Sequence, residues 1–323
     1  MPDAGQSPGS PAGHGPAAEP APGEPTPGKQ APGQPVSERR PSDDSGPGDP
    51  AADQVSAARL YDFFLGGHRN FAVDRELGRR LIDAEPGILQ AALSSRAFLR
   101  RAVRFLATAG IGQFLDLGSG MPAADSVHEI ARQIRPGARV GYVDSDPSAV
   151  AHGRQALADD PGATAVRHDL RDPDGVLADP EVGDLLDLDK PVGLLLVTVL
   201  HQIPDADDPA EVVRGYASRV APGSYLVLAH PTFESCPAAG AIAELCEGGS
   251  AARIQARSRA AIAGFLDGLE LAEPGIVHLP LWRPDGPVPE RPERAWSYGG
   301  VGRKPGAAPD AQPDARPGVG GRG

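Results

Sequence analysis

Lysine is scarce in this chain of 323 residues, where it occurs only as Lys29, Lys190 and Lys304. The formal net charge is −12, and the arginines form no dense basic stripe along the sequence. Sequence-independent binding of nucleic acid depends on neutralising many phosphates with lysine and arginine. The composition therefore argues against a nucleic-acid partner.

Cysteine is also rare, because Cys236 and Cys246 are the only two. Neither has a His or Cys neighbour at the spacing of zinc ligands, so we expect no metal site. The low cysteine content is typical of a reducing compartment and predicts a cytoplasmic protein. The chain has no run of 18 apolar residues and no basic-then-apolar N-terminus. We therefore expect neither a membrane span nor a secretory signal.

Large apolar side chains are missing from the first 50 residues, which contain no Ile, Leu, Phe, Trp or Tyr but 13 of the 36 prolines. Such a segment cannot bury enough apolar surface to offset the entropy lost on ordering. The stretch from about Pro305 has the same character. We expect disordered tails at 1–53 and 305–323 around one domain at 54–304, which divides into a helical segment (54–109) and a Rossmann-like core (110–304).

The periodicity of the apolar residues changes after Gly110. Before it, apolar residues recur at three- and four-residue spacing, which predicts a long amphipathic helix. After it, short apolar runs alternate with helical patterns, at 113–118, 138–144, 164–169, 192–200 and 224–230. This alternation predicts an α/β fold whose parallel sheet is covered on both faces. Two later strands, in "LELAEPGIVHLPLW" and "AWSYGGVGR", predict an antiparallel hairpin at one edge of the sheet.

The stretch "FLDLGSG" (114–120) ends the first predicted strand in a glycine turn. In an open parallel sheet, such a turn lies at the edge where ligands bind. A triphosphate-binding loop would need a lysine after the second glycine, whereas Gly120 is followed by "MPAADS". A looser dinucleotide pattern is present, but Pro122 removes a backbone N–H that a pyrophosphate would use.

Three acidic residues lie at the ends of the first three strands: Asp116, Asp144 in "YVDSDP" and Asp169 in "RHDLRDP". They favour a ligand that is cationic near the turn, and S-adenosylmethionine carries a sulfonium and an ammonium but no phosphate. We expect Asp144 to accept hydrogen bonds from ribose hydroxyls and Asp169 from the adenine amine. For Asp116 two roles stay open, a contact with the amino acid end of the ligand or orientation of the loop through backbone N–H groups.

These strand ends resemble those of class I S-adenosylmethionine-dependent methyltransferases. More narrowly, "ARLYDFFLGGHRNFAVDRE", "SSRAFLRRAVRFL", "GSGMPAADSVHE", "FLDGLELAEPG" and "WRPDG" are similar to signatures of a bacterial family of S-adenosyl methyltransferases. The resemblance runs from about Ala57 to Lys304. It implies a Rossmann-like fold with seven strands in the order 3-2-1-4-5-7-6, with strand 7 antiparallel, helices on both faces and an N-terminal helical cap.

The candidate cofactor-binding residues lie in the glycine turn, at the strand ends and on the long helix: Asp116, Gly118, Ser119, Gly120, Asp144, Ser145, Asp169, Leu170, Val199 and Arg96. Arg96 is interpreted either as a partner for the cofactor carboxylate or as an ordinary surface arginine. His201 in "VLHQIPD" is the candidate general base, since histidine titrates near neutral pH, although such a residue can also simply close a pocket. Tyr61, His68 and Asn70, in the implied cap, are candidate contacts to the acceptor.

Two functions of different classes follow from these residues and patterns. The first is methyl transfer from S-adenosylmethionine to a small molecule, for which the protein supplies positioning and desolvation. The second is a non-catalytic regulatory protein that binds S-adenosylmethionine or S-adenosylhomocysteine in the same pocket. A nicotinamide dehydrogenase is disfavoured because the sequence lacks a Tyr-x-x-x-Lys pair.

Overall fold

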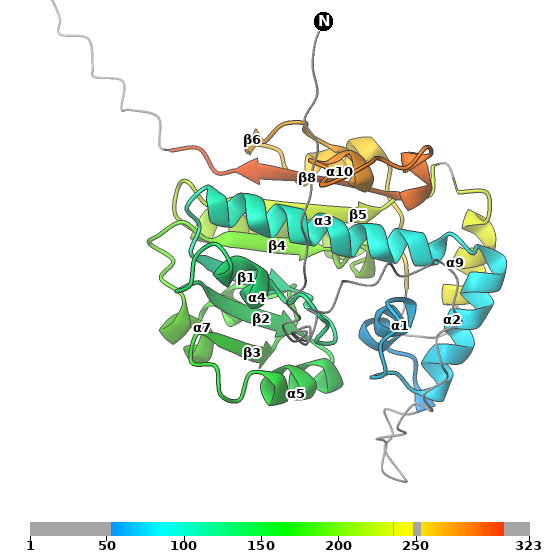
Figure 1. The fold of residues 1–323 in the computed structure, drawn as a ribbon, viewed down its shortest axis with the longest axis horizontal. Coiled ribbons are helices and arrows are strands. Elements are labelled where there is room, and N and C mark those ends of the chain that lie inside the picture. Colours follow the sequence, from blue (N-terminus) through cyan, green and yellow to red (C-terminus); the bar gives the residue numbers. More distant parts are fainter. Residues whose placement is uncertain (1–52, 235, 248–252, 307–323) are drawn as a thin grey trace, which may run out of the picture. The chain divides into compact units, whose positions relative to one another are not determined.

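An eight-stranded sheet forms the centre of the protein (Figure 1), and the computed structural model describes residues 53–234, 236–247 and 253–306. The strand order is β3-β2-β1-β4-β5-β8-β6, and β7 also pairs with β8. The first five of these strands are parallel, whereas β8 runs antiparallel to β5. The strands are β1 Gln113–Leu117, β2 Arg139–Asp144, β3 Ala163–Arg167, β4 Gly193–Val197, β5 Tyr225–Pro231, β6 Glu270–Leu271, β7 Val277–His278 and β8 Ser297–Arg303.

The C-terminal edge of the sheet differs from the sequence-based prediction in two ways. The sheet has eight strands, not seven, because the predicted edge strand is interrupted between β6 and β7. Pro274 cannot donate to the ladder, and the N–H of Gly275 bonds to the carbonyl of Ala272 at 2.9 Å, so the chain turns there. The predicted antiparallel pairing is present, because β6 and β7 both pair with β8. The connection is longer than that of a hairpin, because two 3₁₀ helices, Leu279–Leu281 and Pro292–Ala295, separate β7 from β8.

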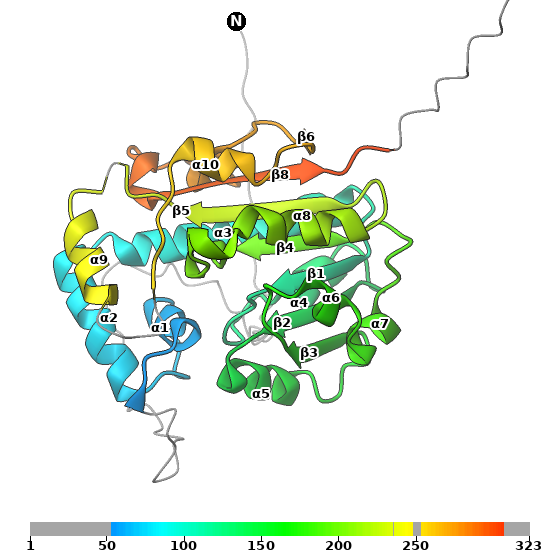
Figure 2. The ribbon, with the colours of Figure 1, turned by 180° about the vertical axis from the view of Figure 1, so that it is seen from behind.

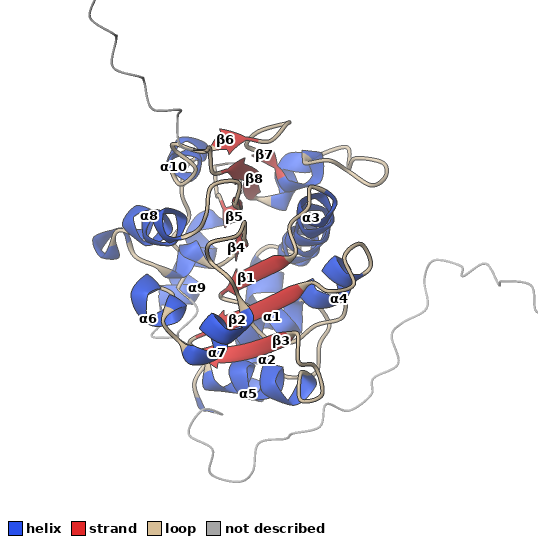
Figure 3. Cartoon of the chain, turned by 90° about the vertical axis from the view of Figure 1, so that its left-hand side faces the viewer, coloured by secondary structure: helices blue, strands red, loops and turns tan. Residues whose placement is uncertain are grey.

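Helices cover both faces of the sheet. α3 (Ile88–Thr108) and α4 (Val127–Arg132) lie on one face (Figure 1), and α6 (Pro173–Leu177), α8 (Pro209–Arg219) and α10 (Arg259–Gly264) lie on the other (Figure 2). Figure 3 shows the sheet between these two layers. Successive strand residues point to opposite faces, so Phe114 packs under α3 while Leu115 packs toward α8. This explains why the strands read as continuous apolar runs.

The helices after the strands begin where the sequence places proline after an acid. α5 (Pro147–Ala156) begins at Pro147, and Asp146 accepts from the N–H of Ser148 at 2.7 Å. α8 begins at Pro209 after the cap residue Asp208. Proline suits the first helical position because an N–H there would have no partner within the helix. The acid before it accepts from a backbone N–H of the first turn that would otherwise also lack a partner. α7 (Pro180–Leu185) begins in the same way.

Three helices lie beyond the carboxyl ends of the parallel strands, namely α1 (Ala57–Phe64), α2 (Ala72–Ala84) and α9 (Ala239–Glu247) (Figure 1). A buried ion pair joins α1 to α2, with the Nε of Arg59 lying 2.7 Å from Oδ2 of Asp74. The same carboxylate accepts from the N–H groups of Ser56 and Phe71 at 2.9 and 2.8 Å. Removal of one member of such a pair typically costs about 3–5 kcal/mol, so this pair fixes the cap.

The predicted tails fall almost wholly outside the described residues, and the domain limits stay a prediction. Within the described part of the chain, no helix is both long enough and apolar enough to cross a bilayer.

Candidate functional site

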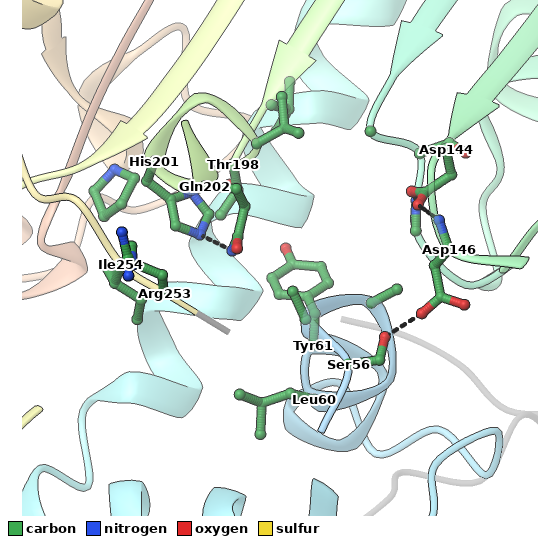
Figure 4. A pocket seen from close by; sticks show the side chains of 18 of the residues that line it. Ser56, Leu60, Tyr61, Asp144, Asp146, Thr198, His201, Gln202, Arg253 and Ile254 are labelled. Carbon is green, nitrogen blue, oxygen red and sulfur yellow. Dashed lines mark hydrogen bonds between the residues drawn. The ribbon is translucent and has the colours of Figure 1, made fainter. Parts of the chain in front are cut away.

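A cavity of about 850 Å³ opens at the carboxyl ends of the parallel strands. Its loop end is formed by the lining residues at the carboxyl ends of β1, β2 and β3 and just after them, within 116–120, 143–147 and 168–171. Its helical end is formed by lining residues of α1, the start of α3, α9, and the segments at Phe233, Arg253–Ile254 and Trp296. The segment after β4, residues 198–202, lies between the two ends (Figure 4).

The predicted glycine turn forms the floor of the loop end. Gly118 and Gly120 have φ angles of 73° and 68°, in the left-handed region that favours glycine. The N–H groups of Gly118 and Ser119 donate to the carbonyl of Val143 at 2.8 and 3.1 Å. A Cβ at Gly118 would lie 2.1 Å from Cγ2 of Val199. The turn therefore needs glycine at position 118 both for its backbone angle and for the close approach of Val199.

Asp144 holds the loops after β1 and β2 together. Its Oδ2 accepts from the N–H of Gly120 at 2.7 Å, and its Oδ1 accepts from the N–H of Asp146 at 2.9 Å. Burial raises the pKa of Asp144, although the backbone donors oppose that shift. Each carboxylate oxygen can accept a second hydrogen bond, so the predicted contact with ribose hydroxyls is compatible with this arrangement and stays a prediction.

Asp116 is buried beneath the turn and lines the loop end. The N–H groups of Gly118, Ser119 and Gly120 donate to Val143 and Asp144, which favours a ligand contact over loop orientation as the role of Asp116. Burial raises the pKa of Asp116 to about 7, with Arg96 opposing the shift and Asp144 adding to it. A buried carboxylate of this kind is suited to a cationic group of a ligand.

Arg96 reaches across the cavity wall toward the loop after the turn. Its Nη2 donates to the carbonyls of Ala124 and Asp125 at 3.1 and 2.8 Å. Its Nε is buried and has no hydrogen-bond partner among the residues that the structure describes. This donor favours the interpretation of Arg96 as a ligand-binding residue over that of an ordinary surface arginine.

Asp169 lies at the rim of the loop end, next to Leu170. Arg171 pairs with it and also bridges to Asp207 at 2.7 Å. The hydrogen bonds from Arg171 lower the pKa of Asp169. The carboxylate of Asp169 is therefore ionised, and its charge is balanced by Arg171. Its predicted contact with adenine stays a prediction. Ser145 also lines this end.

His201 lies in a 3₁₀ turn after β4, Leu200–Gln202, and lines the cavity wall. Its Nε2 lies 2.7 Å from Nε2 of Gln202 (Figure 4). Burial lowers the pKa of His201 to about 3, and the neighbouring His230 and Arg257 add to the effect. The imidazole is therefore neutral at physiological pH and a weak proton acceptor. Its role as a general base stays a prediction.

Of the three predicted acceptor contacts, only Tyr61 lines the cavity. Its hydroxyl donates to the carbonyl of Ala92 at 3.1 Å, and burial raises its pKa to about 12. Asn70 lies away from the cavity, where its Nδ2 donates to Asp62 at 2.7 Å and to the carbonyl of Gly67 at 3.0 Å. His68 is exposed and does not line the cavity. The polar groups of "GGHRN" thus shape the loop after α1.

Sequence reasoning missed two residues that line the cavity. Thr198 follows β4 with φ 57°, and its Oγ1 is buried without a partner among the described residues. The only signal for it was one polar residue inside an apolar run. Trp296 is buried and also lines the helical end. Across the described part of the chain, no three His, Cys, Asp or Glu side chains are grouped to hold a metal ion.

Two glycine substitutions in the turn test the close approach of Val199. Gly118→Ala introduces both a left-handed alanine and a clash with Val199, so unfolding free energy should fall by about 3 kcal/mol. Gly120→Ala has nothing within 4 Å of its new Cβ and should cost about 1 kcal/mol. Urea unfolding curves measure both values. Equal losses would contradict the close approach of Val199 to the turn.

Comparison with known proteins agrees with this site. The family model described as S-adenosyl methyltransferase matches residues 49–305. A proposed methyltransferase from Thermobifida fusca YX is 39% identical, with a TM-score of 0.75, over 79% of this chain and 98% of that chain. A DUF574 family protein from Streptomyces avermitilis MA-4680 is 36% identical, with a TM-score of 0.76, over 79% of this chain and 99% of that chain. No curated protein matches.

The loop end also fits the cofactor of this family. The ammonium group of the cofactor's methionine part suits the buried Asp116, and its carboxylate suits the unpaired Nε of Arg96. The glycines of the turn carry no side chains that would keep the cofactor away from the main chain. Family, fold and site agree: the chain belongs to the S-adenosyl methyltransferase family and is a methyltransferase that depends on S-adenosylmethionine.

Proposed function

We propose that the protein transfers a methyl group to a small-molecule acceptor in the cytoplasm. The observation that carries this proposal is the cavity itself, which continues from the loop end to the space under α1 and α9. Its volume of about 850 Å³ lies in the upper part of the range of roughly 300–1,000 Å³ for small-molecule sites. A cofactor and a small acceptor fit together in such a space.

The net charge of −12 also disfavours a nucleic-acid acceptor. The unpaired thiols of Cys236 and Cys246 suit a reducing compartment such as the cytoplasm.

The residues of this chain supply binding and orientation. The cofactor brings a methyl group that is already activated by a positive sulfur, so the protein must mainly place the reactants and exclude water. We assign the amino acid end of the cofactor to Asp116 and Arg96, and the ribose to Asp144. Ser119, Gly120, Ser145 and Leu170 complete the loop end.

Proton removal is a smaller part of this proposal. The pKa of about 3 means that His201 accepts a proton only from an acidic group. The acceptor atom must therefore be nucleophilic without first losing a proton, or belong to a group acidic enough to lose it unaided. Tyr61 keeps its proton at neutral pH because its pKa is about 12, so it acts as a hydrogen-bonding group and not as a base.

The nature of the acceptor can be tested with S-adenosylmethionine labelled in the methyl group. The full-length protein is incubated with a cell extract that has been separated into small molecules, protein and nucleic acid. Label should enter the small-molecule fraction. More label in the protein or nucleic-acid fraction than in the small-molecule fraction would contradict the proposal. Heat-inactivated protein measures the labelling that does not depend on the enzyme.

The assignment of Asp144 predicts a loss of cofactor affinity. Asp144→Ala removes the acceptor for the ribose and for Gly120, and charged hydrogen bonds contribute about 1.5–3 kcal/mol each. The dissociation constant for S-adenosylhomocysteine should rise ten- to a thousandfold in calorimetric titrations. Asp172→Ala is the matched control, because Asp172 caps α6, accepts from Gly175 at 2.9 Å and does not line the cavity. It should lower stability by about 1 kcal/mol and leave affinity unchanged; a loss of affinity in the control alone would refute the assignment.

The raised pKa of Asp116 predicts that cofactor binding depends on pH. Below about pH 7 the carboxyl group is neutral in the cofactor-free protein and cannot attract an ammonium group. Affinity for S-adenosylhomocysteine should therefore rise with pH up to about 7 and then level off. Binding at pH 6 should release a proton, which calorimetry detects as a dependence of the binding heat on the buffer. Asp116→Asn should bind weakly and without this pH dependence; an unchanged profile in the variant would exclude Asp116 as the titrating group.

A further inference from the structure

The helical end of the cavity has apolar and aromatic walls. Its side chains come from five separate parts of the fold, namely α1, the start of α3, the segment after β5, α9 and the segment before β8. They are Leu60, Phe64, Ile88, Phe233, Ile242 and Trp296. Aromatic rings prefer offset or edge contacts with other rings and bury a large apolar area. Walls of this composition favour a flat apolar ligand.

The charges of the cavity are divided unevenly between its two ends. Four of the carboxylates that line it lie at the carboxyl ends of the first three strands or just after them: Asp116, Asp144, Asp146 and Asp169. The fifth, Asp207, is bound to the same region through Arg171.

The described lining of the helical end contains no carboxylate. Its charged side chains are Arg253 and Arg59, and Arg59 is neutralised by the buried Asp74. A cationic acceptor would enter this end without a counter-charge, and burial of an unpaired charge is unfavourable. The helical end therefore favours an acceptor that is uncharged or anionic.

Thr198 lies between the two ends and combines two unfavourable features. Its φ of 57° places a β-branched residue in the left-handed region, where such residues are strained. Its Oγ1 is buried and has no partner among the described residues. Its N–H donates to the carbonyl of Ala229 at 2.8 Å, which holds the backbone at the end of β4. Strain of this kind is concentrated at ligand-binding positions.

The neighbours of Thr198 place it at the meeting point of cofactor and acceptor. Val199, the next residue, packs against Gly118 of the turn, and Gln202 and His201 follow within one 3₁₀ turn. Figure 4 shows Thr198 beside Gln202, with Tyr61 projecting from α1 toward the same region. A hydroxyl at this point can bind a polar atom of the acceptor.

We propose that the helical end binds a flat aromatic acceptor that is uncharged or anionic, and that the hydroxyl of Thr198 holds its polar substituent. This inference rests on the proposed function, because it assigns the substrate class and a positioning residue of the same site. It adds a selection against positively charged acceptors, which follows from the missing carboxylate, and a specific hydrogen bond, which follows from the unpaired hydroxyl of Thr198.

The substrate class is tested with three probes that share one ring system: 2-naphthol, 2-naphthoate and 2-naphthylmethylammonium. Each is titrated into full-length protein saturated with S-adenosylhomocysteine, and binding is followed by ligand-detected NMR. The naphthol or the naphthoate should bind at least tenfold more tightly than the ammonium probe. Equal or tighter binding of the ammonium probe would overturn the proposal, as would the absence of binding by all three.

The role of Thr198 is tested with one substitution that removes the hydroxyl and one that keeps it. Thr198→Val should weaken binding of the preferred probe about three- to tenfold, the effect of one hydrogen bond, whereas Thr198→Ser should retain it. Affinity for S-adenosylhomocysteine should stay unchanged in both variants. Thr164→Val is the matched control, because that hydroxyl donates to Glu181 on the surface and does not line the cavity.

A merely structural role for Thr198 gives a different result. The melting temperature of Thr198→Val would then fall, whereas loss of an unpaired buried hydroxyl should leave it equal or higher. A probe affinity that Thr198→Val leaves unchanged would also refute the positioning role. Failure of S-adenosylhomocysteine to bind the unchanged protein would instead refute the proposed function, so the two proposals fail separately.

Discussion

The carboxylate of Asp144 is the interaction on which the cofactor site depends. It accepts hydrogen bonds from the loop after β1 and from the loop after β2, so one side chain sets the distance between two segments that are not adjacent in sequence. Parallel pairing brings these segments to one edge of the sheet, where the N–H groups of Gly118 and Ser119 already bond to Val143. The acid adds its side-chain contact to these bonds. Because Asp144 is half-buried, the contact is also partly shielded from solvent, which strengthens it.

The cap is linked to this same carboxylate through a short series of polar contacts. Asp146, whose N–H bonds to Asp144, caps α5 and also accepts from the hydroxyl of Ser56. Ser56 begins α1, and its own N–H donates to Asp74 of the buried ion pair. The helices that cover the cavity are thus connected to the loops that bind the cofactor. A displacement of the covering helices relative to the cofactor-binding loops would require several hydrogen bonds to change together.

Much of the fold could be predicted, because it depends on local patterns. Apolar runs indicate the strands, and the starts of α5 and α8 coincide with acid–proline pairs that can be read in the sequence. Asp116 and Asp144 follow from the same reasoning, since strand ends meet at one edge. The helical end could not be predicted, because it joins α1, α9 and Trp296, which are far apart in the chain. Asn70 was predicted to contact the acceptor, but its side chain donates to Asp62 and to the loop backbone. A sequence alone does not distinguish a polar residue that stabilises a loop from one that binds a ligand. The strain at Thr198 depends on backbone angles that only the folded chain defines.

The position of β8 has a consequence for the order in which the protein folds. This strand is the last described element, yet it lies inside the sheet, between β5 and β6, with Tyr225 opposite Arg303. During synthesis, β1 to β5 emerge early and can pair, but the edge of β5 stays open until residues 297–303 arrive. An unpaired edge is a site for association with other chains. Nascent chains of this protein should therefore be most prone to aggregation, and most in need of chaperones, while the segment between β5 and β8 is being made.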